Sequence, residues 1–194
     1  MRKKICVLFS IALILLLLIP MPANARFLGH SWPRSGSLTR IPINVGAGIW
    51  EGNMHSSVNS WNTHVGHFVR FEHSVASNNL AVKRLNMQGS WFGMAYMWVS
   101  GGSSIVQFEI VLNHDHIVAQ AINVNNYVRS IMAHELGHIL GLADNPSTTS
   151  NTIMSHTRQR NIITIPQPFD IESVRIVYGF MSRDIINNEE EDEV

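Results

Sequence analysis

The residues from His134 to Asp144, which read HELGHILGLAD, combine side chains that can bind a metal ion with one that can move a proton. His134 and His138 are four residues apart, so on a helix both leave the same face, one turn above the other. At that spacing, two imidazole nitrogens can reach one Zn²⁺ at about 2.0–2.1 Å. Glu135 directly follows the first histidine, so it lies near the metal without binding it and can take a proton from a metal-activated water. The pattern predicts a hydrolytic zinc site.

A third protein ligand is needed, because two histidines alone hold zinc weakly. Gly141 can adopt the left-handed conformation that ends a helix and turns the chain back. Asp144, six residues after His138, can then bring a carboxylate oxygen to the same ion at about 2.0–2.2 Å. Three protein ligands leave a fourth position for water, as in catalytic zinc sites, whereas structural sites are closed. The alternative third ligand is a distant glutamate, for which Glu172 is the best candidate, but it leaves Gly141 and Asp144 unexplained.

These residues resemble the signature of the metzincin zinc metalloproteases, H-E-x-x-H-x-x-G-x-x-H, with Asp144 in place of the last histidine, as in a minority of that family. Residues 151–155 (NTIMS) resemble the Met-turn of the family, in which Met154 would form an apolar floor beneath the metal. Looser similarities at Trp61-Asn62, at Phe71 and at residues 169–179 indicate the matrixin subgroup, the matrix-metalloprotease-like proteins.

The resemblance implies an α+β (α/β-like) catalytic domain. It would contain a twisted, mixed five-stranded sheet with an antiparallel edge strand, an active-site helix, the Met-turn and a C-terminal helix. The implied activity is that of a zinc metalloendopeptidase. In such a sheet, residues 92–99 (FGMAYMWV) would form the edge strand above the cleft and bind a protein or peptide substrate in extended conformation.

His156 departs from the matrixin pattern, because matrixins usually place proline two residues after the Met-turn methionine. Two other metzincin groups place there a tyrosine that can reach the metal site. His156 is therefore a candidate hydrogen-bond donor to the tetrahedral intermediate, or a resting-state zinc ligand, with a solvated loop histidine as the alternative. Asp170 also has two interpretations. It is either a buried carboxylate that braces the Met-turn, as the resemblance implies, or an acid that interacts with the dipole at a helix N-terminus.

Two further groups of polar side chains are weaker candidates for a second Zn²⁺ or a structural Ca²⁺, and surface histidines are the favoured interpretation of both. The groups are His114-Asp115-His116 and the set His64, His67 and His73. We also expect residues 155–168, including Arg158 and Arg160, to form the wall of a substrate pocket whose shape the sequence does not define.

Hydrophobic periodicity predicts the elements that must position these residues. Apolar side chains at steps of three and four predict a helix over residues 50–65, and further helices are expected at about 126–140 and 170–178. Runs rich in β-branched and aromatic residues predict strands at 41–45, 68–71, 80–85, 91–99 and 104–112. Helices and strands mixed in this order favour a single α+β or α/β domain.

The start of the chain predicts a secretory signal peptide over residues 1–25. Arg2, Lys3 and Lys4 precede an apolar run, and Ala23-Asn24-Ala25 offers a cleavage site, whereas an uncleaved membrane anchor is the minor alternative. The only cysteine, Cys6, lies inside this segment, so packing and bound metal would have to stabilise the exported protein.

The expected catalytic domain covers residues 26–186, and residues 187–194 form an acidic tail. Its run Glu189-Glu190-Glu191-Asp192-Glu193 indicates a disordered segment, with docking of a partner as the alternative. The formal net charge is zero and no basic surface is indicated, so a nucleic-acid partner is not expected.

The sequence as a whole predicts a secreted, extracellular, monomeric zinc metalloendopeptidase with no membrane association after signal cleavage. The rival from another class is a secreted, non-catalytic module that binds zinc or peptides. Glu135 argues against it, because metal retention alone does not require a base at that position.

Overall fold

A mixed sheet forms the framework of the computed structural model, which describes residues 27–179 apart from residues 35, 47, 86 and 147–150. Within these residues the sheet has five strands in the order β2-β1-β3-β5-β4. The strands are β1 (Thr39–Val45), β2 (Val69–His73), β3 (Leu80–Arg84), β4 (Gly93–Ser100) and β5 (Ser104–Asn113). All neighbouring pairs are parallel except β4 and β5, which are antiparallel. The predicted α+β class, mixed five-stranded sheet and antiparallel edge strand are confirmed.

The sheet carries its core on one face, as the alternation along β1 shows. Ile41, Ile43 and Val45 are buried, whereas Arg40 and Pro42, which alternate with the buried positions, are exposed. This period of two is expected of a strand with one face against the core.

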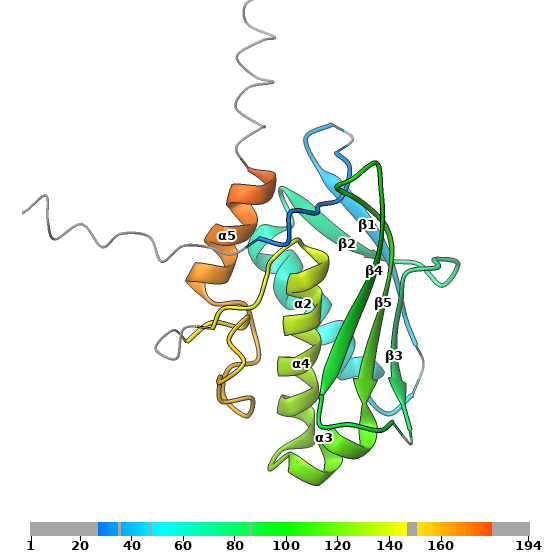
Figure 1. The fold of residues 1–194 in the computed structure, drawn as a ribbon, viewed down its shortest axis with the longest axis vertical. Helices are drawn as coiled ribbons and strands as arrows, with labels where there is room; N and C mark the ends of the chain where they lie inside the picture. Colours follow the sequence, from blue (N-terminus) through cyan, green and yellow to red (C-terminus); the bar gives the residue numbers. More distant parts are fainter. Residues whose placement is uncertain (1–26, 35, 47, 86, 147–150, 180–194) are drawn as a thin grey trace, which may run out of the picture.

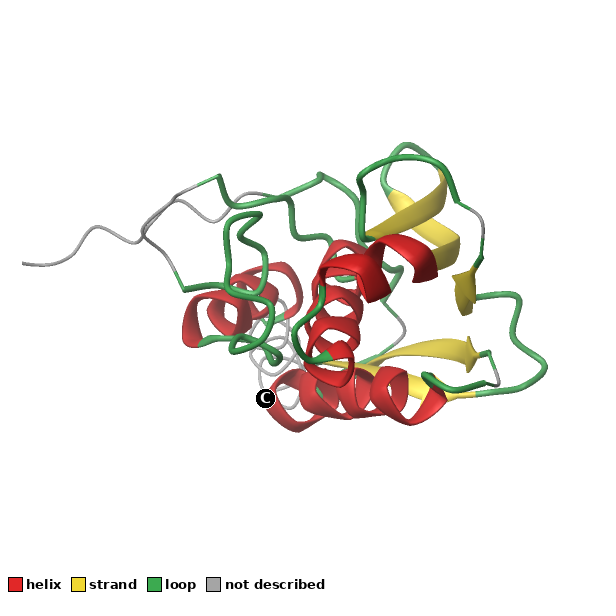
Figure 2. Cartoon of the chain, turned by 90° about the horizontal axis from the view of Figure 1, so that it is seen from below, coloured by secondary structure: helices red, strands yellow, loops and turns green. Residues whose placement is uncertain are grey.

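Two helices, α2 (Glu51–Val65) and α4 (Val124–Ile139), pack together and against the sheet (Figure 1). Trp61 of α2 is fully buried, and its indole N–H donates a hydrogen bond of 2.8 Å to the carbonyl oxygen of Ala133 in α4. α5 (Pro168–Tyr178) also contacts α2. Figure 2 shows α5 and the loops that follow α4 on one side and the strands on the other.

The boundaries of all the predicted helices and strands lie within two residues of the sequence prediction. α4 begins at Val124, earlier than predicted, because the side chain of Asn123 caps it by accepting a hydrogen bond from Asn126 N. One described helix was not predicted, α3 (His114–Gln120). Ile117 is the one residue of α3 that is buried, so no apolar stripe signals this helix in the sequence.

A side-chain clamp joins α2 to β2 at two of the positions singled out in the sequence. The side-chain amide of Asn62 donates to the carbonyl oxygen of Phe71 at 2.8 Å and accepts from its N–H at 2.9 Å. The sheet edge is thereby fixed to the helix that packs against α4.

The predicted signal peptide (1–25), the acidic tail (187–194) and both limits of the predicted domain (26 and 186) lie outside the described residues. Among the described residues, no helix has the length and apolar character that crossing a membrane requires.

Candidate metal centre

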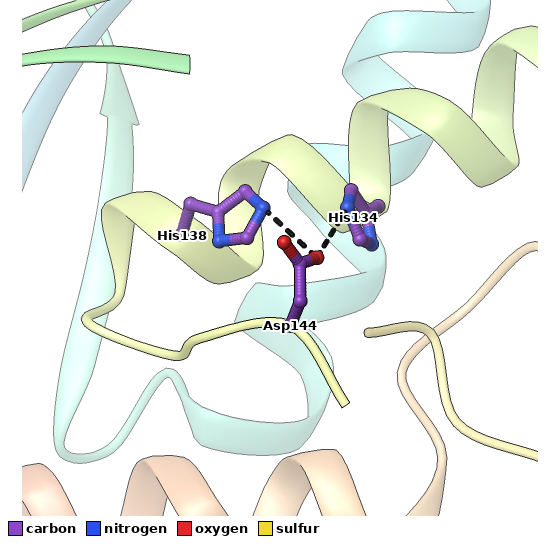
Figure 3. A group of neighbouring side chains, drawn as sticks. All are labelled: His134, His138 and Asp144. Atoms are coloured by element: carbon purple, nitrogen blue, oxygen red, sulfur yellow. Dashed lines mark ion pairs between the residues drawn. The ribbon is translucent and has the colours of Figure 1, made fainter. Parts of the chain in front are cut away.

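The predicted ligands meet at the C-terminal end of α4. His134 and His138 leave the same face of the helix, and Asp144 returns from the segment that follows it (Figure 3). Gly141 makes the return possible: its φ is +88°, and Leu142 N donates to Gly137 O at 3.0 Å, which closes the helix end. The left-handed turn predicted at Gly141 is therefore confirmed.

The three side chains present their donor atoms to one point. Asp144 Oδ1 lies 3.2 Å from His134 Nε2 and 3.5 Å from His138 Nε2. One donor atom from each residue lies within 4.8 Å of the other two. In the described part of the chain, no other group of three or more histidine, cysteine or carboxylate side chains comes together in this way.

The other candidate groups are engaged locally. His114 stacks on Trp50 and approaches Asp115 at 2.9 Å, and His116 packs against Phe92. His73 makes an edge contact with His55. The described structure thus gives no support to the second zinc or calcium site considered from the sequence.

Backbone carbonyls fix the tautomers of both histidines. His134 Nδ1 lies 2.9 Å from Ile153 O, and His138 Nδ1 lies 2.9 Å from Leu142 O. A carbonyl oxygen only accepts, so each Nδ1 carries the proton and each Nε2 presents its lone pair toward Asp144. This arrangement orients imidazoles for binding a metal through Nε2.

The charge states agree with this assignment. Burial, together with the charge of Arg158, lowers the pKa of His134 to about 3, and burial also lowers the pKa of His138. Asp144 is a carboxylate at neutral pH, because the pKa of its side chain lies below the usual value. At neutral pH the centre consists of two neutral imidazoles and one carboxylate, so the short histidine–aspartate contacts are not ion pairs.

These donors fit a zinc ion. Asp144 Oδ1 is buried and accepts no hydrogen bond from the described residues, because the two nitrogens that face it present lone pairs and not protons. Three converging electron-rich atoms repel one another unless a cation lies between them. Two imidazoles and one carboxylate form a donor set that Zn²⁺ accepts in catalytic sites.

Glu135 lies beside the centre, where α4 passes under β4. Its carboxylate accepts a hydrogen bond from the backbone N–H of Ala95, and burial is the main cause that raises its pKa to about 8. Gly93 leaves room for it, because a Cβ at that position would lie 2.6 Å from Glu135 Oε1. Neither Ala95 nor Gly93 is identifiable from the sequence motif.

Met154, predicted to form an apolar floor beneath the metal, packs against α4. It is buried, and a Cβ added at Gly137 would overlap its Sδ atom. The loop that carries it is held by Asp170, whose carboxylate accepts from the N–H groups of Ile153 at 2.8 Å and Met154 at 3.4 Å. Asp170 also accepts from Gln167 N at the start of α5, so both interpretations of this residue are confirmed.

His156 stands at the rim of the centre. Its Nε2 lies 3.0 Å from Asp144 Oδ2, the oxygen that does not face the two helix histidines. The side chain is 63% exposed, so it can move with little cost in packing.

Arg158 occupies a position that the sequence pattern does not reveal. It was expected in a pocket wall and does line one, but it is also buried and hydrogen-bonded, with Nε on Ser130 Oγ at 3.0 Å and Nη1 on Ser155 O at 2.9 Å. Nη1 also lies 3.2 Å from His134 Nδ1. Because Nδ1 donates its proton to Ile153 O, this approach is a close contact and not a hydrogen bond.

Comparison with protein-family models finds no match, and comparison with curated proteins finds none either. Among solved structures, the chain is similar to high choriolytic enzyme 1, a hatching enzyme zinc-protease from Oryzias latipes (medaka fish). The alignment covers 80% of this chain and 98% of that chain, with 15% identity and a TM-score of 0.49. A likeness this distant is too weak to transfer a function.

Proposed function

We propose that the protein is a zinc-dependent metalloendopeptidase of the metzincin type, with His134, His138 and Asp144 as ligands and Glu135 as general base. One observation carries the proposal: two imidazole Nε2 atoms with fixed tautomers and a buried, otherwise unpartnered carboxylate oxygen converge on one point. The matrixin-like details, Asp144 as third ligand and export through a signal peptide belong to the same proposal.

The bound ion and its proposed protein ligands would have separate roles. A bound Zn²⁺ supplies Lewis-acid activation of a carbonyl group and of water. His134 and His138 hold it through Nε2, while Ile153 and Leu142 keep the imidazoles oriented from behind. Three protein ligands leave room for substrate at the metal, which distinguishes a catalytic from a structural site.

Glu135 moves the proton. With its pKa near 8 in the metal-free protein, it is poised close to neutral pH, and a nearby dication favours its ionised form. It would accept a proton from the attacking water and pass it to the leaving amine. The N–H of Ala95 fixes the carboxylate in place, so the base does not have to reorganise.

β4 is suited to bind an extended peptide. It is the last strand in the sheet order, and its residues Gly93 and Ala95 lie against Glu135. A strand with one free edge can add a peptide by backbone hydrogen bonds. We propose that a protein or peptide substrate binds along this edge as a partner of a monomeric enzyme.

Two rival functions find less support. A peptidase with Glu172 as third ligand is disfavoured, because Glu172 is exposed on α5 and pairs with Arg175 at 3.4 Å. A non-catalytic zinc- or peptide-binding module would gain nothing from burying Glu135, whose raised pKa reflects a cost to the folded protein at neutral pH.

The decisive experiment measures cleavage of a pool of internally quenched peptides by the zinc-loaded protein. We expect cleavage that a chelator abolishes and added Zn²⁺ restores. Glu135→Gln should lower kcat by about 10²–10⁴-fold while zinc content stays near one per chain, because the change removes the base and keeps the ligands. Full zinc occupancy without any cleavage would instead favour the binding module.

A further inference from the structure

A pocket of about 240 Å³ adjoins the proposed metal centre. His134 and Glu135 are among its lining residues, so a substrate held at the metal would place a neighbouring residue there. Phe92, Arg158 and Arg160 also line it. Two positive charges on the wall of one pocket are unusual for a site that receives an apolar side chain.

Arg158 supplies a buried positive charge next to the proposed metal centre. Its side chain is buried, with partners that are a hydroxyl and backbone carbonyls of Ser130 and Ser155. None of the described carboxylates lies within ion-pair distance of it. Burial lowers its pKa to about 9, which leaves it cationic at neutral pH. Three carboxylates farther away favour its charged form, those of Glu135, Asp144 and Asp170, but none of them forms a direct ion pair with it, so an anion that enters the pocket can still pair with this charge.

Arg160 is the more accessible of the two. Its guanidinium lies 4.5 Å from the centre of the Phe92 ring, and Nη2 donates to His156 O at 3.1 Å. Its Nε is buried and has no hydrogen-bond partner in the described structure, and the side chain forms no ion pair there either. The ring contact and the His156 carbonyl hold the guanidinium in position while a donor remains unused.

We propose that this pocket binds a carboxylate of the substrate, with Arg160 as its direct partner and Arg158 as a fixed second charge. The inference rests on the proposed peptidase function and adds the substrate class: peptides with a negative charge next to the scissile bond. A guanidinium presents paired donors that match the two oxygens of a carboxylate. A lysine or arginine side chain would be repelled by both wall arginines.

Two sources can supply this carboxylate. An internal aspartate or glutamate side chain is compatible with the proposed endopeptidase and would give it a preference for acidic residues. The C-terminal carboxylate of a peptide would limit it to cutting near chain ends. The test therefore uses two sets of short peptides in an alanine- and glutamine-based background. In the first set both ends are blocked and one position carries Glu, Gln or Lys in turn; in the second, all side chains are neutral and the C-terminus is free.

Binding is measured with the zinc-loaded Glu135→Gln variant, so that it does not depend on turnover. We expect the blocked Glu peptide to bind about tenfold or more tightly than its Gln counterpart, and the Lys peptide to bind more weakly than both. Arg160→Gln should remove the difference between Glu and Gln, and Arg160→Lys should keep part of it. The matched control is Arg175→Gln, which changes an exposed arginine on α5 and should leave the difference intact.

The outcomes separate this inference from the proposed function. Equal binding of the Glu, Gln and Lys peptides together with no gain from a free C-terminus, or a Glu preference that survives Arg160→Gln, overturns the carboxylate pocket even if the native enzyme cleaves peptides. Selective, Arg160-dependent binding supports the pocket even if the native protein cleaves none of them, in which case the peptidase proposal fails alone. If the peptides with a free C-terminus bind more tightly than the blocked Gln peptide, and the blocked Glu peptide does not, the pocket is assigned to the C-terminal carboxylate.

Discussion

Asp170 and His134 are linked through the backbone of a single residue, Ile153. The carboxylate of Asp170 accepts the Ile153 N–H at 2.8 Å, and the Ile153 carbonyl accepts the Nδ1–H of His134 at 2.9 Å. The start of α5 thus sets the position of the loop that orients His134, a proposed metal ligand. An imidazole fixed from behind in this way is a better ligand than one free to rotate.

Replacing Asp170 should therefore affect both stability and metal binding. Asp170→Asn removes the charge and places an amide where N–H groups need an acceptor, so we expect the free energy of unfolding to fall by about 2–4 kcal/mol. The Kd for zinc should rise by about 10–100-fold. Denaturant unfolding and zinc competition measure the two effects. Glu172→Gln, an exposed change on the same helix, should alter neither; loss of stability without loss of zinc affinity would refute the link to His134.

The third ligand can be assigned by comparing two carboxylates. Asp144→Ala should lower zinc affinity by at least about 100-fold, because two histidines remain and the site loses its one anionic donor. Glu172→Ala should retain one zinc per chain, because its side chain is exposed and pairs with Arg175. Metal content after dialysis against a weak chelator measures both. The reverse result would assign the site to the rival family of zinc peptidases.

The pH dependence of the metal-free protein tests the burial of Glu135. Its pKa is raised from 4.5 to about 8, so its contribution to stability is complete below pH 4.5 and is lost as the pH rises through about 8. His134, with a pKa lowered from 6.5 to about 3, acts in the opposite sense, and its contribution is lost as the pH falls from about 6.5 toward 3.

Between pH 6.5 and 8 the effect of Glu135 should therefore be visible alone. We expect the free energy of unfolding of the metal-free protein to fall by up to about 1.4 kcal/mol per pH unit in this range. Glu135→Gln, which cannot titrate, should lack this slope. Urea unfolding at several pH values in the presence of a chelator measures it, and parallel profiles for the two proteins would contradict a protonated, buried Glu135.

His156 contacts the outer oxygen of Asp144, Oδ2, at 3.0 Å. A donor on that oxygen would hold the carboxylate so that the other oxygen, Oδ1, faces the metal. We expect His156→Ala to raise the Kd for zinc by about tenfold, and to lower kcat further if the imidazole also donates to the tetrahedral intermediate. His55→Ala, a histidine change on α2, serves as the control. If zinc affinity and kcat are both unchanged, His156 is an ordinary loop histidine.

The position of the proposed metal ligands follows from local spacing, which is why the sequence alone predicts that they come together. Residues four apart on a helix share a face, and a left-handed Gly141 turns the chain so that Asp144 returns to that face. The strands and the three longer helices carry periodic apolar side chains and were predicted in the same way, whereas α3 buries one residue and gives no such signal.

The environment of those ligands depends on contacts between distant parts of the chain, which no local pattern encodes. His134 receives its orienting carbonyl from a residue 19 positions away, and Arg158, which contacts the same imidazole, is 24 positions away. The burial that raises the pKa of Glu135 requires β4 to lie over α4. The sequence by itself determined which side chains form the candidate metal centre. Tertiary packing decided their tautomers and charges and the charge of the adjoining pocket, because desolvation and hydrogen bonding arise only when separate elements come together.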